Sequence, residues 1–357
     1  MVKLLRRSRS LAILESLLCF THLLKYSILN TQFQHPIINI QFVVHRNKRT
    51  LSERHFNFIP YIRYQRAVRR MNNIDQVKTI AVAGAGTMGS GIAQLSAQAG
   101  YQTVLYDLSE DMVQKGLASI RENLKIAVTK KKISVTESES ILQRIHTSVN
   151  VDELVAEVVI EAIIERLDIK TAFFKQLATI NNKESIFCSN TSSIPITLLA
   201  KEIPYPERIA GMHFFNPAHL MKLVEIVSGE HTSTNCAQTV YDLAVKMGKQ
   251  PVMTKDRPGF IVNRIGKMYH TESLKLLEEG IAPVATIDQL MEAGGFKMGP
   301  FRLIDLIGVD ANLNVTKSLY ELMGREERFQ PSVIQQQMVD AGMLGRKSGQ
   351  GFYKYNE

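Results

Sequence analysis

A histidine and a glutamate stand at mirror positions of one predicted hairpin. Residues 208–215 and 222–227 both have the pattern of short apolar strands, and a polar connection centred near His219 joins them. With the turn centred there, His213 and Glu225 face each other, and the Cβ atoms of such a pair lie about 5 Å apart. The carboxylate would bind one imidazole nitrogen and leave the other free as a general base. The same spacing also fits a half-buried histidine with a structural role.

A glycine-rich segment follows the first well-patterned strand, residues 78–83. It reads Gly84-Ala85-Gly86-Thr87-Met88-Gly89, and residues 90–99 continue at helical spacing. In a dinucleotide-binding fold the first glycine makes the tight turn, the second admits the pyrophosphate, and the third lets the helix pack on the strand. A second strand, residues 103–106, ends in Asp107, where a carboxylate accepts hydrogen bonds from the adenosine ribose and repels a 2′-phosphate. The combination predicts binding of NAD rather than NADP.

A helical hairpin interrupts the alternation of strands and helices after Asp107. Residues 112–128 and 135–145 have helical spacing, and Thr136 and Glu139 match a capping box at the start of the second helix. Lysines 130, 131 and 132 lie between the two helices. They fit either a solvated surface or a contact with the phosphates of a nucleotide-bearing substrate.

Polar residues follow the last strand of the alternating region. Residues 157–161 and 185–188 have strand character, and a helix over 165–177 between them contains Lys170. The second of these strands ends in Ser189-Asn190-Thr191-Ser192-Ser193. Because ligands bind at the carboxyl ends of parallel strands, this segment is expected to face the ligand crevice. Alternatively, Ser192 or Ser193 caps a following helix.

A domain boundary is predicted near Asp256-Arg257-Pro258-Gly259. Beyond it helical patterns cover residues 260–279, 286–293, 301–323 and 332–341, and Asn263 lies near the start of the first. The predicted fold class is therefore α/β. A Rossmann-type dinucleotide-binding domain with an inserted helical hairpin (71–257) precedes an all-α C-terminal domain (258–357).

The first 70 residues differ in composition from the rest. They hold 13 of the 43 lysines and arginines but 2 of the 34 acidic residues, so the net charge of +9 becomes −2 over residues 71–357. They also contain no glycine, which is unusual for a folded domain. We interpret residues 1–70 as a non-globular leader, with Met71 as the start favoured over an organellar transit peptide or a secretory signal. A cytoplasmic location follows, or the mitochondrial matrix if the leader is a transit peptide.

Several classes of partner and site are not indicated. The near-neutral body gives no reason to expect a nucleic-acid partner. The apolar stretch at residues 11–20 is too short to span a membrane. Cys188 and Cys236 have no paired spacing, so we expect buried thiols and neither a metal site nor a disulfide framework.

Taken together, these residues resemble the short-chain L-3-hydroxyacyl-CoA dehydrogenase family, and most closely its bacterial 3-hydroxybutyryl-CoA dehydrogenases. The resemblance covers residues 77–357. It rests on the segments at residues 84–89, 160–162, 189–193, 213–217, 258–264, 298–301 and 345–355.

The resemblance implies a set of roles. It implies His213 as the base, Glu225 as its partner, and Ser192 and Asn263 as contacts to the substrate oxygen. The implied contacts to NAD are the glycine-rich segment (Gly84, Gly86, Thr87, Met88, Gly89), Asp107, Glu165, Lys170 and Ser192. Asn123 and Lys130 would contact the coenzyme A of an acyl-CoA substrate, although relatives carry serine in place of Asn123. A homodimer is also implied, as is a role in fatty-acid or butyrate metabolism, whose direction the sequence does not fix.

Two rival functions remain open. A gulonate 3-dehydrogenase of the same superfamily would keep the glycines and the histidine but bind a sugar acid. A non-catalytic NAD-binding structural protein would need none of the four residues His213, Glu225, Ser192 and Asn263. Turnover of acetoacetyl-CoA against gulonate separates these alternatives.

Overall fold

The computed structural model describes residues 73–355. The predicted leader, residues 1–70, and the proposed start at Met71 lie outside the described residues. No helix within the described range is long and apolar enough to cross a bilayer. The same range contains no group of three or more His, Cys, Asp or Glu side chains placed to hold a metal ion.

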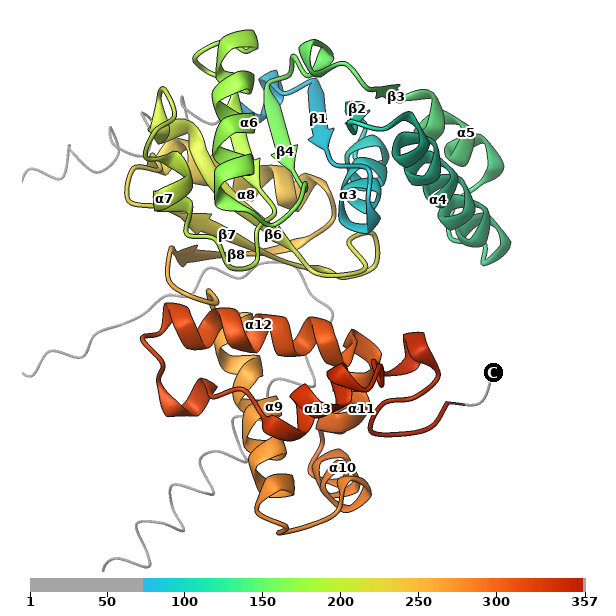
Figure 1. The fold of residues 1–357 in the computed structure, drawn as a ribbon. Helices are drawn as coiled ribbons and strands as arrows, with labels where there is room; N and C mark the ends of the chain where they lie inside the picture. The colour runs from blue at the N-terminus through green and yellow to red at the C-terminus, as the bar shows by residue number, and fades with distance from the viewer. Residues whose placement is uncertain (1–72, 356–357) are drawn as a thin grey trace, which may run out of the picture. The chain divides into compact units, whose positions relative to one another are not determined.

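An eight-stranded sheet forms the first part of the fold, with the strand order β3-β2-β1-β4-β5-β6-β7-β8 (Figure 1). The strands from β1 to β6 run parallel, β7 is antiparallel to β6, and β8 is parallel to β7. Their bounds are β1 Thr79–Ala83, β2 Gln102–Tyr106, β3 Ile145–Ser148, β4 Val158–Glu161, β5 Ile186–Ser189, β6 Ile209–Phe214, β7 Leu223–Ser228 and β8 Gln250–Lys255. This Rossmann-like arrangement confirms the predicted fold class.

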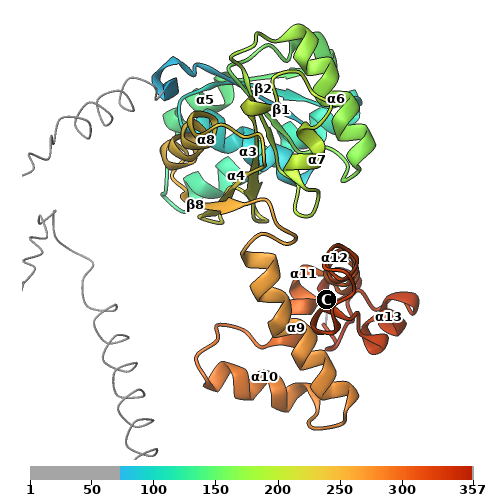
Figure 2. The ribbon, with the colours of Figure 1, turned by 90° about the vertical axis from the view of Figure 1, so that its left-hand side faces the viewer.

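Helices cover both faces of the sheet, and Figure 2 shows α6 and α7 on the side opposite α3, α4 and α8. The helices are α3 Thr87–Gln98, α4 Glu110–Thr129, α5 Val135–Gln143, α6 Leu167–Ile180, α7 Ile196–Ala200 and α8 Thr234–Lys246. Alternate residues of β1 face the helices on opposite sides of the sheet. Ile80 and Val82 belong to the same hydrophobic cluster as residues of α3, whereas Ala81 and Ala83 belong to the cluster that contains Phe174 of α6. Such strands are buried on both faces, which explains their nearly continuous apolar sequence.

The second part of the fold is helical. It comprises α9 Val262–Glu278, α10 Val284–Ala293, α11 Pro300–Ile307, α12 Val309–Leu322 and α13 Val333–Asp340. Of the short 3-10 helices, Asn73–Gln76, Val151–Glu153 and Pro206–Arg208 belong to the first part, and Glu327–Phe329 and Arg346–Ser348 to the second. The core of the helical part contains Phe301, Ile304 and Leu274. Buried Asp305 accepts hydrogen bonds from the backbone of Phe352 and ties the C-terminal tail to α11.

Three details of the sequence interpretation were wrong. The capping box of α5 is Ser134 with Glu137, not Thr136 with Glu139: each of the first pair binds the other's backbone N–H. Both pairs match the motif, and the helix begins at Val135 as predicted, but its N-cap is Ser134, two residues before Thr136. Ile145 lies in β3 rather than in α5, because it pairs with Thr103.

The predicted helix over residues 301–323 is two helices. Gly308 separates α11 from α12 with φ 104°, a backbone conformation that L side chains rarely adopt. The chain therefore turns at this glycine instead of continuing as one helix.

Candidate active site

The glycine-rich segment has the shape that a dinucleotide needs. Gly84 has φ 97°, and a Cβ on Gly89 would lie 1.6 Å from the Gly84 carbonyl oxygen, so only glycine allows this close approach of α3 to β1. At Gly86 a Cβ would meet no atom of the described residues within 4 Å, which leaves space for a phosphate. Thr87 begins α3, whose amino end favours an anion. The residues present therefore fit the pyrophosphate of NAD.

Asp107 lies directly beyond β2 and is fixed by the same segment. Its Oδ2 accepts a hydrogen bond from the Ala85 backbone N–H at 2.8 Å. The second carboxylate oxygen remains available for a ribose hydroxyl. No arginine between residues 73 and 355 binds this carboxylate, so nothing there offsets its repulsion of a 2′-phosphate.

The strand register places His213 directly opposite Glu225, as the hairpin pattern predicted. His213 Nδ1 lies 2.8 Å from Glu225 Oε2; the glutamate is 0% exposed and the histidine 6%. Glu225 Oε1 accepts from the backbone N–H groups of Ile261 and Val262, each at 2.9 Å. Burial alone would raise the pKa of Glu225, but the hydrogen bonds from His213, Val262 and Ile261 lower it. The carboxylate is thus held ionised beside the imidazole.

Two aromatic rings flank His213. The ring centroids of Phe215 and Phe260 lie 4.5 and 5.6 Å from that of the imidazole. Phe260 has φ 48°, in the left-handed region that costs a non-glycine residue free energy and that recurs at functional sites. Sequence reasoning missed Phe260, although the Pro258-Gly259 pair before it signals an unusual turn.

A buried lysine, which was not predicted from the sequence, binds the connection between β6 and β7. Lys249 Nζ donates to the carbonyl oxygens of Ala218 and Met221 at 2.6 and 2.8 Å. Burial lowers the pKa of Lys249 to about 8. At the last residue of β6, the Phe214 N–H donates to Asn190 Oδ1 at 2.9 Å, and this bond connects β6 to the segment after β5.

The polar segment after β5 is organised around Glu165. Glu165 Oε1 accepts from Thr191 Oγ1 at 2.6 Å, from the Ser192 N–H at 3.0 Å and from Ser193 Oγ at 3.1 Å. The following helix, α7, has Pro195 as its N-cap, so the interpretation of Ser192 or Ser193 as a helix cap was wrong. The N–H of Ser192 is instead used to hold the loop in place.

A buried cation links this loop to β4. Lys170 binds Glu161 in a fully buried ion pair and lies 3.2 Å from Glu165 Oε2. Burial raises the pKa of Glu161, whereas at Glu165 the Lys170 charge and the hydrogen bonds from Thr191 and Ser192 outweigh burial and lower the pKa. The structure thus brings Glu165, Lys170 and Ser192 together. Glu161 and Thr191, which complete the network, were not predicted as site residues.

The remaining predicted site residues lie on three helices. Asn123 of α4 donates to Gln94 Oε1 of α3 at 3.2 Å, and Lys130 caps the end of α4. Asn263 stands in the first turn of α9, next to Val262, whose N–H binds Glu225. The roles of these three residues remain predictions. Cys188 and Cys236 are free and buried, as expected, and burial raises the pKa of both thiols.

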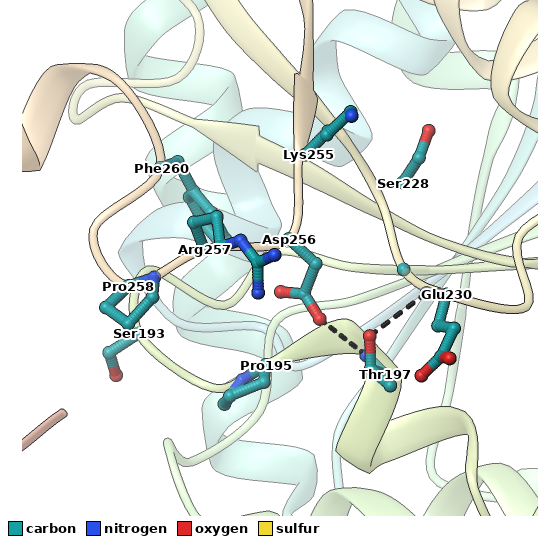
Figure 3. A pocket seen from close by; sticks show the side chains of 11 residues that line it. Ser193, Pro195, Thr197, Ser228, Glu230, Lys255, Asp256, Arg257, Pro258 and Phe260 are labelled. Atoms are coloured by element: carbon teal, nitrogen blue, oxygen red, sulfur yellow. Dashed lines mark hydrogen bonds between the residues drawn. The ribbon is translucent and has the colours of Figure 1, made fainter. Parts of the chain in front are cut away.

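A cavity of about 710 Å³ adjoins this region (Figure 3). It is lined by Ser193, Pro195 and Thr197 after β5, by residues at the ends of β7 and β8, and by Phe260. Phe260 therefore contacts both the cavity and His213.

Comparisons with known proteins agree with this geometry. The family model of the 3-hydroxyacyl-CoA dehydrogenase NAD-binding domain matches residues 79–257, and that of the C-terminal domain matches residues 259–355. The chain belongs to the 3-hydroxyacyl-CoA dehydrogenase family. The expected family, the class of NAD-dependent dehydrogenase and the cofactor NAD are thereby confirmed.

Three relatives illustrate the match. The chain is 44% identical over 281 residues to 3-hydroxyadipyl-CoA dehydrogenase of Escherichia coli, covering 78% of this chain and 59% of that longer protein. It is 42% identical to "Probable 3-hydroxybutyryl-CoA dehydrogenase" of Bacillus subtilis, covering 79% and 99% of the two chains. The crystal structure of (S)-3-hydroxybutyryl-CoA dehydrogenase from Ralstonia eutropha superposes with a TM-score of 0.76 at 40% identity, covering 79% and 100%.

Proposed function

We propose that this chain catalyses the reversible NAD-dependent oxidation of (S)-3-hydroxyacyl-CoA to 3-ketoacyl-CoA, with 3-hydroxybutyryl-CoA as its substrate. The observation that carries the proposal is the contact of 2.8 Å between His213 Nδ1 and a fully buried Glu225 carboxylate. Two relatives that this chain covers almost from end to end carry the name "Probable 3-hydroxybutyryl-CoA dehydrogenase". They support the acyl-CoA substrate over gulonate.

His213 acts as the general base through Nε2. With Glu225 bound at Nδ1, that nitrogen carries a proton, and Nε2 is left with the lone pair that removes the proton of the C3 hydroxyl. NAD, when bound, accepts the hydride from C3. Glu225 stabilises the imidazolium that forms, and in the reverse reaction the imidazolium returns the proton to the carbonyl oxygen.

Ser192 and Asn263 position the reacting oxygen in this proposal. Glu165 fixes the backbone of Ser192, and Glu225 fixes the first turn of α9, which carries Asn263. The Glu225 carboxylate thus orients the base and also holds the first turn of the helix that presents the Asn263 amide to the substrate oxygen. Holding the reacting groups in the correct orientation lowers the activation barrier.

Three further assignments complete the proposal. Asn123 and Lys130 contact coenzyme A, residues 71–257 form the NAD-binding domain, and residues 258–357 form the dimerisation domain of a cytoplasmic homodimer. Sedimentation equilibrium of the full chain measures the oligomeric state. A monomer at micromolar concentration would contradict that part.

Oxidation of NADH with acetoacetyl-CoA tests the activity directly. We expect turnover with acetoacetyl-CoA and none with gulonate and NAD. Absence of turnover with any short- or medium-chain 3-ketoacyl-CoA would contradict the main proposal and leave the non-catalytic NAD-binding protein.

Cofactor choice is tested at Asp107. Its carboxylate is fixed by Ala85 and should make kcat/KM higher for NADH than for NADPH, because a 2′-phosphate would be repelled. Asp107→Ser should narrow that preference. An unmodified protein that prefers NADPH would show that Asp107 does not have this role.

A further inference from the structure

A strained turn joins β8 to α9 directly beside the pair of His213 and Glu225. Phe260 in this turn has φ 48°, a left-handed conformation in which the Cβ of an L residue crowds the backbone. Such strain persists only where the surrounding structure over-determines it. The contacts that Phe260 makes must therefore offset the cost of its backbone conformation.

The preceding residues explain why the chain turns, but not why Phe260 is left-handed. Pro258 and Gly259 occupy the two central positions of a turn that the Phe260 N–H closes on the Arg257 carbonyl oxygen at 2.9 Å (Figure 3). A proline followed by a glycine with positive φ is typical of a type II turn, and Gly259 has φ 71°. Phe260 lies after these two positions, where a glycine would adopt the left-handed conformation without strain. What a phenylalanine adds at this position is its side chain.

The Phe260 ring is buried against the imidazole of His213. Phe260 is 6% exposed, and the centroids of the two rings lie 5.6 Å apart with an angle of 59° between their planes. Phe260 also belongs to the hydrophobic cluster that contains Ile196 and Val227. The other non-glycine residues with a positive φ between positions 73 and 355 are all exposed: Lys131, Tyr205 and Arg325. Phe260 differs from them in combining a left-handed backbone with a buried side chain.

The backbone that follows Phe260 binds Glu225. The next two residues, Ile261 and Val262, donate their N–H groups to Glu225 Oε1, each at 2.9 Å, and Val262 begins α9. The N–H groups at the start of a helix have no partner within the helix, and they favour a carboxylate. The left-handed step at Phe260 sets the direction in which the chain enters α9. The conformation of this one residue therefore decides whether both N–H groups reach the carboxylate.

We propose that Phe260 is a positioning residue of the 3-hydroxyacyl-CoA oxidation: its backbone directs two N–H groups at Glu225, and its ring fixes the orientation of the His213 imidazole. The inference rests on the proposed function and adds a residue to the same site. Phe260 takes no part in proton or hydride transfer. It restricts rotation of the imidazole, so that Nε2 stays directed at the substrate while Glu225 holds Nδ1.

Replacing the Phe260 ring is the direct test. Phe260→Leu removes the ring but keeps a branched apolar side chain in the cluster. We expect kcat for NADH oxidation with acetoacetyl-CoA to fall by about 10- to 100-fold, as for a small misplacement of a catalytic group, while KM for either substrate changes by less than about twofold. Phe260→Gly is the second variant. Glycine retains the left-handed backbone without strain, so its loss of kcat reports the ring alone.

Tyr205→Leu is the matched control, because Tyr205 is also a left-handed aromatic residue but is 50% exposed. Its kcat should equal that of the unmodified enzyme. The proton NMR signal of His213 Cε1–H gives a readout that does not depend on turnover, since the rings of Phe215 and Phe260 beside the imidazole shift it. The signal is identified by its absence from the spectrum of His213→Gln. It should move in both Phe260 variants and stay in place in Tyr205→Leu.

The outcomes separate the positioning role from the proposed function. Unchanged kcat in both Phe260 variants, or an unshifted His213 signal, would overturn the positioning role and leave the proposed function standing. An equal loss of kcat in Tyr205→Leu would also overturn it, because the loss would then not depend on contact with His213. Absence of acetoacetyl-CoA turnover in the unmodified enzyme would instead overturn the proposed function and this inference together.

Discussion

His213 and His270 are equally buried, each 6% exposed, yet their surroundings are opposite in charge. His213 faces the carboxylate of Glu225. His270 of α9 faces the backbone-bonded ammonium of Lys267, and its Nδ1 lies 2.8 Å from Asn312 Nδ2. Burial and the Lys267 charge lower the pKa of His270 to about 3. Two imidazoles of equal exposure thus have neighbours of opposite charge.

The two clusters also differ in how fully their polar atoms are satisfied. Both Glu225 oxygens are hydrogen-bonded, whereas His270 Nε2 and Gln335 Oε1 are buried without a partner in the described part of the chain. Lys267, 5% exposed, donates to the Asn312 carbonyl oxygen at 2.7 Å, and burial lowers its pKa to about 7. A buried charge without a counter-ion reduces stability. The helical cluster should therefore affect folding, and the hairpin pair catalysis.

Exchanging the two histidines for glutamine is the strongest test of this contrast. Loss of a general base typically lowers the rate by about 10²- to 10⁴-fold, so His213→Gln should reduce kcat by that factor while NAD affinity stays unchanged. His270→Gln should leave kcat unchanged. Steady-state kinetics and NAD titration measure both. A comparable loss in the two variants would remove the distinction between the clusters.

Whether each histidine's surroundings could be predicted from the sequence depends on whether its neighbours follow from a local pattern. The pairing of His213 with Glu225 was predictable, because strand period and turn centre fix which residues face each other. The Lys267–His270 cluster was not, since nothing in a helical pattern says that a lysine is buried.

Two parts of the fold were also beyond the reach of local patterns. Strand β8 has mixed polarity, and its identity comes from pairing with β7. The left-handed Phe260 depends on the packing of Gly259 against Leu319 and of its own ring against His213. Both are set by contacts between residues far apart in the chain.

Lys267→Met should stabilise the protein in a pH-dependent way. The folded-state pKa of about 7 lies below the usual 10.5, so the unfolded chain binds the proton more tightly. Stability should therefore rise with pH between about 7 and 10.5 in the unmodified protein, and the methionine variant should lack that rise. The shift corresponds to at most about 5 kcal/mol, reduced by the loss of the hydrogen bond to Asn312. Urea unfolding at pH 7 and 10 measures it; equal differences at the two pH values would contradict the assignment.

His270→Leu should act in the acid range. A pKa of about 3 in place of 6.5 means that the neutral imidazole contributes stability that is full above pH 6.5 and is lost as pH falls toward 3. The leucine variant lacks this loss, so its advantage should grow on acidification and reach about 2 kcal/mol at pH 5. His231→Leu, at an exposed position, is the matched control. A variant that loses stability on acidification as steeply as the unmodified protein would show that His270 is not the group that titrates.

Glu225→Gln removes the carboxylate that distinguishes the surroundings of His213 from those of His270, and it should lower kcat by less than His213→Gln does. Removing the carboxylate takes away the group that stabilises the imidazolium formed when His213 accepts the substrate proton. The plateau of kcat should also fall, because the glutamine amide can donate to Nδ1 and place the proton on the wrong nitrogen. The double variant with His213→Gln should be little worse than His213→Gln alone, since the two residues share one function. Additive losses of kcat in the double variant would show that Glu225 does not act through His213 and that the neighbouring carboxylate is not what separates the two histidines.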